Sequence, residues 1–299
     1  MQPTFPLLRL PENATIKVLR NLSLEQLFFI SLVSSKTKRL VTSLGLRADR
    51  VDIRIDRLNE VVVHTQAPYL NLTLRPFTLL EFKDWMNHIR TIFCFTSPAN
   101  VLQRMLFFQN SVRFTVQSLK DAIGNVSDLF LSRQLTDVMS RNVLKHFNTP
   151  STLFLYRNPF EEVSEIQKIF IQNFKTISFH DVYSLDDMLL VNSESVQFTK
   201  PISQKRFNRF VKLWICGSNP RLQRMDLSIN KTDVASGEVY LEGIRCMEMS
   251  QDAKKEIRQK HKFSVNADMI QIRRNDGTPA VIATYDGQRR LHMFLIVLH

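Results

Sequence analysis

The sequence contains only seven glycines and three cysteines among 299 residues, and none of its apolar runs approaches the length of a membrane span. We therefore expect no transmembrane helix. The cysteines, Cys94, Cys216 and Cys246, are odd in number and far apart, which favours reduced thiols in the cytoplasm or nucleus over a disulfide framework. No basic segment followed by an apolar run and a small-residue cleavage site is present, so we also expect no secretory signal.

The motifs that usually mark catalytic or metal sites are missing as well. The seven histidines show no HxxxH or HExxH spacing, and there is no CxxC pair, no phosphate-binding glycine loop and no GxSxG motif. His180-Asp181 and Asp186-Asp187 could form acid–base pairs, but a surface loop and a helix N-terminus explain them more simply. The sequence predicts a protein that is not an enzyme and has no catalytic residue, metal or cofactor.

What the sequence does contain is a long apolar stretch from Phe5 to Gly45, which predicts three short helices in tandem. Pro11 is tolerated in the first helical turn, and Ser23 with Gln26 forms a predicted capping box for the second helix. The second helix is apolar around almost its whole circumference, and Gly45 is suited to end the third. Such a unit exposes more apolar surface than it can bury, so either a partner or the rest of the chain must cover it.

The residues of this stretch resemble an F-box. The segment FPLLRLP (5–11), the pair Val18-Leu19 and the segment SLVSSK (31–36) fall at the spacings of that family. The resemblance implies that residues 4–46 bind a Skp-type adaptor and, through it, a cullin. The residues that we expect to contact the adaptor are apolar members of the first two helices: Leu10, Pro11, Val18, Leu19, Leu22, Leu27, Leu32 and Val33. Several of these are expected to pack the helices together instead, and a plain helical cap on the main domain is the alternative.

After Gly45 the pattern changes to alternating apolar and polar residues, which is typical of half-buried strands. Strands are predicted at 51–56, 61–64 and 70–74, and a helix at 77–95. A further strand is predicted at 112–116, and one or two helices between it and His146.

From Thr152 onward, strands and helices alternate. Strands are predicted at 152–156, 176–180, 195–199 and 222–229, and helices at 161–172, 184–191 and 203–216. Units of this kind suggest an irregular leucine-rich-repeat-like stack, although the signature LxxLxLxxN is not intact. An ordinary α/β sheet of strand–helix–strand units fits the same alternation.

A second resemblance lies in the segment FNRFVKLWICGSNPRLQRMDLSI (207–229), which is similar to the type 2 F-box-associated domain of nematode F-box proteins. Segments 184–198 and 270–285 and the closing FLIVLH support it, although the Trp that often ends the family is absent. Phe207, Phe210 and Trp214 are spaced to face a core, and Asn219-Pro220 predicts an extended turn. Residues 268–285 are expected to form a hairpin.

The predicted fold class is therefore α+β or α/β, with the three-helix F-box followed by an irregular, leucine-rich-repeat-like α/β domain that ends in a β-hairpin. We expect the substrate-recognition region to span 47–299 and the F-box-associated domain about 175–245. This organisation implies a substrate receptor of a Skp–cullin–F-box ubiquitin ligase. Its protein substrate is unknown, and loops or an exposed sheet face of residues 100–299 would contact it.

Charge offers a competing hypothesis. The net charge is +12, and the stretch from Thr199 to Met225 holds seven Lys or Arg and no acid, with aromatic residues interleaved. Basic and aromatic residues together are typical of nucleic-acid-binding surfaces. The aromatic residues are predicted to lie on the opposite helix face from most of the basic ones. A solvated basic face, or one that attracts an acidic substrate protein, is therefore the favoured interpretation.

Overall fold

The structure is a computed structural model that describes residues 9–56, 59–65, 71–74, 79–93, 102–109, 114–148, 150–234 and 240–298. The chain divides into two compact units, Met1–Pro150 (unit 1) and Ser151–His299 (unit 2). Parts of the predicted features lie outside the described residues, namely Phe5 to Leu8 of the F-box-like motif, Cys94, the first two residues of the strand predicted at 112–116, and His299.

Unit 1 begins with the three predicted helices, α1 (Glu12–Leu19), α2 (Leu24–Val33) and α3 (Ser35–Thr42). The predicted capping box is present, because Ser23 accepts from the backbone of Gln26 at 3.2 Å and donates its own N–H to the Gln26 side chain at 2.9 Å. Ser34 and Thr37 form a second box before α3. Gly45 has a φ of +67°, as predicted for the end of this helix.

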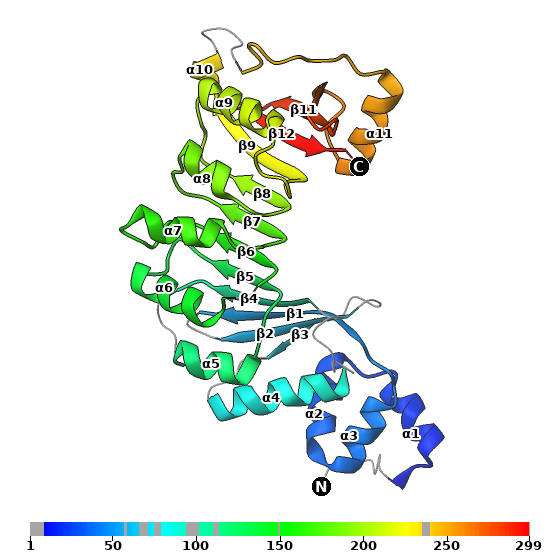
Figure 1. Cartoon of the computed structure of the whole chain (residues 1–299). Helices are drawn as coiled ribbons and strands as arrows, with labels where there is room; N and C mark the ends of the chain where they lie inside the picture. Colours follow the sequence, from blue (N-terminus) through cyan, green and yellow to red (C-terminus); the bar gives the residue numbers. More distant parts are fainter. Residues whose placement is uncertain are drawn as a thin grey trace. The chain divides into compact units, whose positions relative to one another are not determined.

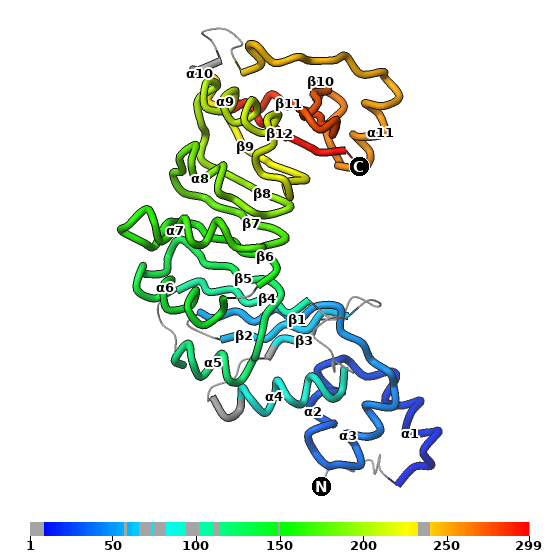
Figure 2. The backbone as a smooth tube through the Cα atoms, in the orientation of Figure 1, coloured from blue at the N-terminus to red at the C-terminus, as the bar shows by residue number. Residues whose placement is uncertain are grey.

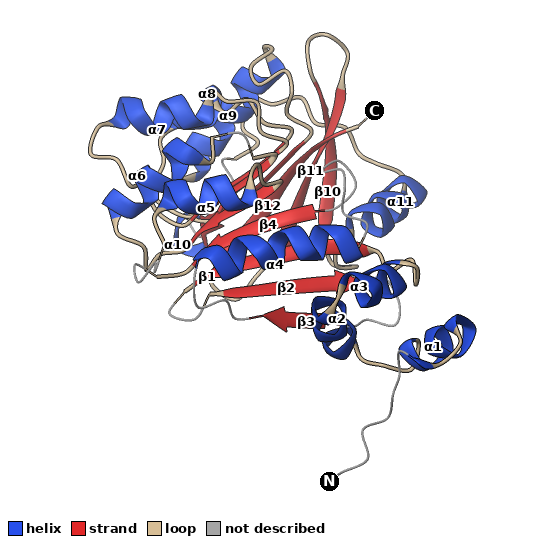
Figure 3. Cartoon of the chain, turned by 90° about the horizontal axis from the view of Figure 1, so that it is seen from below, coloured by secondary structure: helices blue, strands red, loops and turns tan. Residues whose placement is uncertain are grey.

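The sheet of unit 1 has the strand order β5-β4-β1-β2-β3. Strands β1 and β2 pair antiparallel, as do β2 and β3, whereas β1, β4 and β5 run parallel. The strand bounds are β1 (Ala48–Ile55), β2 (Glu60–Thr65), β3 (Asn71–Leu74), β4 (Leu102–Phe107) and β5 (Asp128–Leu131). The helices that follow are α4 (Leu79–Ile92), α5 (Val116–Ile123) and α6 (Asp137–His146). Figure 3 shows α4 over these strands, with α2 and α3 near one of its ends.

Side chains alternate across the strands of unit 1, so one sheet face is apolar and the other polar. The apolar face carries Val51, Ile53 and Ile55 of β1, which are all fully buried. The first three strand predictions and the helix at 77–95 correspond to β1, β2, β3 and α4.

The strand predicted at 112–116 is wrong in its described part. Thr115 is the N-cap of α5, because its hydroxyl accepts from the backbone N–H of Ser118 at 3.1 Å, and Val116 is already helical. The strands of this region are instead β4 and β5, which the sequence analysis missed. A polar side chain on the core face of β4 hides its alternation: Gln103 is buried and donates to the carbonyl of Ile123.

Unit 2 holds the predicted alternation of strands and helices. The strands are β6 (Thr152–Leu155), β7 (Thr176–Phe179), β8 (Ser195–Phe198), β9 (Arg224–Asn230), β10 (Asp268–Arg273), β11 (Pro279–Asp286) and β12 (Arg290–Val297). The helices are α7 (Val163–Phe170), α8 (Leu185–Leu190), α9 (Gln204–Ile215), α10 (Lys231–Val234) and α11 (Gln251–His261). The strand order is β10-β11-β12-β9-β8-β7-β6, as traced in Figure 2.

Strands β6 to β9 are parallel neighbours in sequence order, and α7, α8 and α9 follow one another along the same side of them (Figure 1). Both predicted descriptions, repeat-like stack and ordinary α/β sheet, share this mixed α/β arrangement. The leucine-rich-repeat-like description stays a prediction. None of the helices in the described part of the chain is long and apolar enough to cross a bilayer.

The predicted hairpin is formed by β10 and β11, which pair antiparallel, and Gly277 in its turn has a φ of +94°. Strand β12 then joins β11 to β9. Helix α11, which the sequence analysis did not predict, packs through Ile257 against Met269, Val281 and Ile296 on the sheet face opposite to α9.

The extended turn predicted at Asn219-Pro220 is corrected by the structure. Asn219 has a φ of +50°, and its buried side-chain amide donates to the carbonyls of Met188 at 2.9 Å and Val191 at 2.9 Å. These bonds satisfy orphan carbonyls at the end of α8 and outweigh the usual preference of a residue before proline for extended backbone.

Candidate functional site

Helix α2 is apolar on two faces, and the structure separates them. Leu24, Leu27, Phe28 and Ser31 are spaced at i, i+3, i+4 and i+7 and are buried. Phe29, Leu32 and Val33 lie on the other side and are exposed, with Val33 at 72% and Phe29 at 48% of their full accessible surface. We call these three residues the α2 patch. An exposed apolar stripe of this kind marks an interaction surface.

The buried face of α2 anchors the helices to the rest of unit 1 through α4. The ring of Phe28 meets Trp85 edge-on at a centroid distance of 6.1 Å and His88 at 5.4 Å. Ser31 forms a buried hydrogen bond of 2.5 Å with Nε2 of His88. The three-helix segment is therefore held on its own chain by one face of α2, which leaves the other face free for a partner.

The eight residues predicted to contact an adaptor fall into three groups in the structure. Pro11, Val18, Leu32 and Val33 are exposed, and Leu10 and Leu22 are partly buried. Leu19 and Leu27 are buried, so they are among the several residues expected to pack the helices together. Phe29 was not predicted, although its spacing to Leu32 and Val33 at i+3 and i+4 could have identified it.

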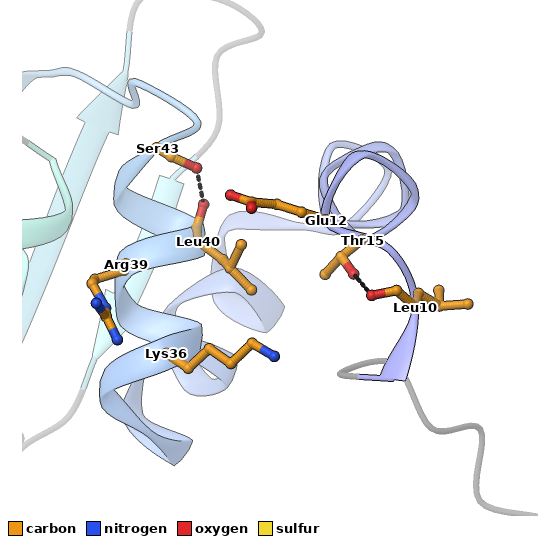
Figure 4. A pocket seen from close by; sticks show the side chains of 7 residues that line it. All are labelled: Leu10, Glu12, Thr15, Lys36, Arg39, Leu40 and Ser43. Atoms are coloured by element: carbon orange, nitrogen blue, oxygen red, sulfur yellow. Dashed lines mark hydrogen bonds between the residues drawn. The ribbon is translucent and has the colours of Figure 1, made fainter.

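A pocket of about 480 Å³ lies between α1 and α3 of the same segment (Figure 4). Its lining is mostly polar: Leu10, Glu12, Thr15, Lys36, Arg39, Leu40 and Ser43. Figure 4 shows the Glu12 side chain directed toward α3 and that of Lys36 toward α1, with Leu40 between them. The lining combines charges of both signs with two leucines, so the pocket is a recess in the three-helix surface.

The polar sheet face of unit 1 is a compact network of opposite charges. Asp52 is buried and lies 3.0 Å from Arg50, 3.0 Å from His64 and 4.0 Å from Arg104. Arg104 also lies 3.4 Å from Asp128. Each of these charges has a partner of opposite sign among the described residues, so the network offers a ligand no unpaired charge.

The polar sheet face of unit 2 offers accessible side chains of another kind. Tyr156 stacks on His180 at a centroid distance of 4.2 Å, and Ser178 bonds both to His180 at 3.0 Å and to Gln197 at 2.8 Å. Burial lowers the pKa of His180 below its usual value, so the ring is neutral at pH 7. The exposed side chains of Tyr156 and Gln197 can make aromatic contacts and hydrogen bonds with a protein, whereas Ser178 is fully buried.

Helix α9 carries the basic stretch that suggested nucleic-acid binding. Its aromatic residues Phe207, Phe210 and Trp214 are fully buried, as the predicted helical spacing requires. They cannot stack on bases, so an aromatic platform for nucleic acid is missing from this helix. The polar residues Gln204 and Asn208 are also buried, and they bind the backbone of residues 240–242.

Among the described residues, no group of three or more His, Cys, Asp or Glu side chains is arranged to hold a metal ion. Cys216 and Cys246 are free and exposed.

Comparison with known proteins agrees with both resemblances. Residues 7–49 match the F-box domain family, and residues 165–227 match the F-box associated family. The F-box associated domain-containing protein sdz-33 of Caenorhabditis elegans is 23% identical over 247 residues, which cover 74% of this chain and 77% of that protein. No solved structure matches the chain.

Proposed function

Since the chain carries an F-box followed by an F-box associated domain, as proteins of the substrate-receptor type do, we propose that it is the receptor subunit of a Skp–cullin–F-box ubiquitin ligase. The F-box binds a Skp-type adaptor and through it a cullin, and the α/β region holds a target protein. The contribution of such a subunit is effective concentration: it keeps the target near the ubiquitin-charged enzyme and performs no chemistry itself.

The exposed α2 patch is the observation that carries this proposal. Phe29, Leu32 and Val33 stand on a helix whose other face is anchored to α4. Because this helix is already held in place, binding requires little further ordering of its backbone, and burial of the patch favours association. Val18 of α1 and Pro11 extend the proposed contact surface.

The proposal also includes the domain bounds, the target-contacting surface and the cellular location. We place the F-box at 4–46 and the substrate-recognition region at 47–299, with the F-box-associated domain at about 175–245. The unknown target contacts the polar sheet face or loops of residues 100–299. The expected location is the cytoplasm or nucleus, where the adaptor and cullin would be met.

Co-purification with a Skp-type adaptor tests the proposal. Val33→Asp places a charge in the middle of the α2 patch, and Val138→Asp provides a matched control, because Val138 is also helical and is 69% exposed, on α6. Each buried aliphatic side chain contributes about 1.5–3 kcal/mol. We therefore expect Val33→Asp to weaken adaptor binding by roughly tenfold to a hundredfold. Val138→Asp should bind as wild type does.

Wild-type protein that fails to retain the adaptor would contradict the receptor function. Equal losses in both variants would show that a general change in charge or folding, and not the α2 patch, controls binding. Thermal unfolding of each variant separates these cases, because both substitutions are on exposed positions and should leave the midpoint nearly unchanged.

A further inference from the structure

A second pocket, in unit 2, is lined by four cationic side chains and no acidic one. It has a volume of about 520 Å³ and lies between the end of α9, residues 243–247 and the turn of the β10–β11 hairpin. We call it the basic pocket. Its cations are Lys212, Arg245, Arg273 and Arg274, and its apolar wall consists of Ile215, Ile244 and Met247.

The frame of the basic pocket is fixed by hydrogen bonds between its three segments. The backbone of Met247 pairs with Gln271 at 2.8 and 3.0 Å, which ties residues 243–247 to the edge strand β10. The backbone N–H of Asn275 donates to the carbonyl of Ile215 at 3.0 Å, which holds the hairpin turn on α9. The buried Asn208 supports the same frame through the carbonyls of Tyr240 and Glu242. The pocket is thus preformed, as binding sites usually are.

The cations divide into one structural residue and three available ones. Arg274 bonds to the carbonyl of Gly217, lies 3.5 Å from Asp276 and covers the ring of Trp214. Lys212, Arg245 and Arg273 are exposed and form no ion pair within the described residues, although Arg273 donates from Nη1 to the carbonyl of Gly277 at 3.1 Å. Gly243, at a φ of +67°, brings its loop so close to Lys212 that an added Cβ would lie 3.2 Å from Nζ.

We propose that the basic pocket binds an acidic segment of the target protein, one in which Asp or Glu alternates with aliphatic residues. This inference rests on the proposed function, because the acidic segment is a target only if the chain is a receptor. Binding of the segment to the pocket does not depend on the adaptor. Three exposed cations that form no ion pair among the described residues surround an apolar wall. This arrangement is complementary to carboxylates that flank an aliphatic side chain. A nucleic acid is the weaker fit, because no accessible aromatic residue lines the pocket for base stacking.

Fluorescence anisotropy of the full chain tests this assignment. The probe is a short labelled peptide in which Glu and Leu alternate, and the reference peptide carries Gln in place of Glu. The test variant is Lys212→Glu with Arg245→Glu. The control variant is Lys255→Glu with Lys260→Glu on α11, which makes the same change in net charge at exposed positions. At physiological salt we expect the test variant to bind the Glu peptide about tenfold more weakly, and the control variant less than about twofold more weakly.

Alkylation of Cys216 gives a second readout that needs no variant, because this exposed thiol lines the pocket. The Glu peptide should slow the reaction at Cys216, and the Gln peptide should not. Equal weakening in the two variants, equal binding of the Gln peptide, or displacement of the Glu peptide by poly(U) RNA would each overturn the proposal. None of these measurements requires adaptor binding. A chain that fails to bind the adaptor can therefore still bind the peptide, so failure of the proposed function is distinguishable from failure of the pocket proposal.

Discussion

Ser31 and His88 are joined by a hydrogen bond whose direction follows from its neighbours. The Ser31 hydroxyl donates its one proton to the carbonyl of Phe28 at 2.6 Å, so it must accept from Nε2 of His88. Nε2 of the imidazole therefore carries a proton. Burial, reinforced by the charge of Lys38, lowers the pKa of His88 from 6.5 to about 4, so the ring is neutral at pH 7.

The stability of unit 1 should therefore depend on pH through His88. Its pKa is lower in the folded chain, so the unfolded chain binds more protons between pH 6.5 and 4. The contribution of His88 is fully present above pH 6.5 and is lost as the pH falls toward 4. Between pH 7.5 and 4.5 we expect this residue to cost about 2–3 kcal/mol of unfolding free energy. His88→Gln keeps a hydrogen-bond donor for Ser31 and cannot titrate. Between the two pH values, the unfolding free energy of this variant, measured by urea titration, should therefore fall by about 2–3 kcal/mol less than that of the wild type. Identical losses in both proteins would refute the assignment.

At the scale of the element, α2 shows why neighbouring residues of the same type have different roles. Phe28 and Phe29 are adjacent and in edge-on contact at 5.7 Å, yet Phe28 is fully buried against α4 and Phe29 belongs to the α2 patch. The helical rotation of 100° per residue is enough to place one ring in the core and the next at the surface.

These two phenylalanines give a matched pair of substitutions. Phe28→Ala removes a fully buried ring and should cost about 3–5 kcal/mol of unfolding free energy, whereas Phe29→Ala should cost less than about 1 kcal/mol. Adaptor affinity should respond in the opposite order: Phe29→Ala lowers it roughly tenfold or more. Urea titration and calorimetry with the Skp-type adaptor, at a temperature where both variants are folded, measure the two effects. An adaptor affinity that Phe29→Ala leaves unchanged would remove this residue from the contact surface.

The sequence allowed most elements to be predicted where local chemistry agreed with burial. The capping box at Ser23 and the alternating strands β1, β2 and β6 to β9 are examples. Prediction failed where a polar residue served the core. Gln103 faces inward on β4 while Leu102 is exposed, so the strand pattern is inverted. Helix α11 was missed because Ile257 is its only residue that the structure shows as buried, which leaves no apolar stripe.

The candidate surfaces were predictable to a smaller extent. Helical periodicity identified α2 as a helix with more apolar surface than it could bury. It could not show which face would pack against α4, because both faces are apolar. The choice depends on a contact with residues more than fifty positions away. The basic pocket combines α9, a loop and a hairpin turn. The sequence placed Lys212 in a basic stretch, and only the fold brings Arg245 and Arg273 beside it.

At the scale of the whole molecule, the α2 patch and the basic pocket belong to different compact units. A receptor that acts by effective concentration needs both surfaces occupied at once and requires no communication between them. Coupling between two binding sites would appear as a change in the affinity for one ligand when the other is bound. The two surfaces are each preformed, so occupation of one should not alter the other.

We therefore expect the affinity for the Glu–Leu peptide to change by less than about twofold when a saturating amount of Skp-type adaptor is present, because less than about 0.5 kcal/mol of coupling joins independent sites. Anisotropy titrations with and without adaptor measure this directly. The immobilised peptide should also capture the adaptor when this chain is added, and Val33→Asp should break that bridge while the chain itself stays on the peptide. An affinity that changes more than about fivefold would correspond to at least 1 kcal/mol of coupling and would make the receptor allosteric. In that case target capture would depend on assembly of the ligase, and the simple tether would be the wrong mechanism.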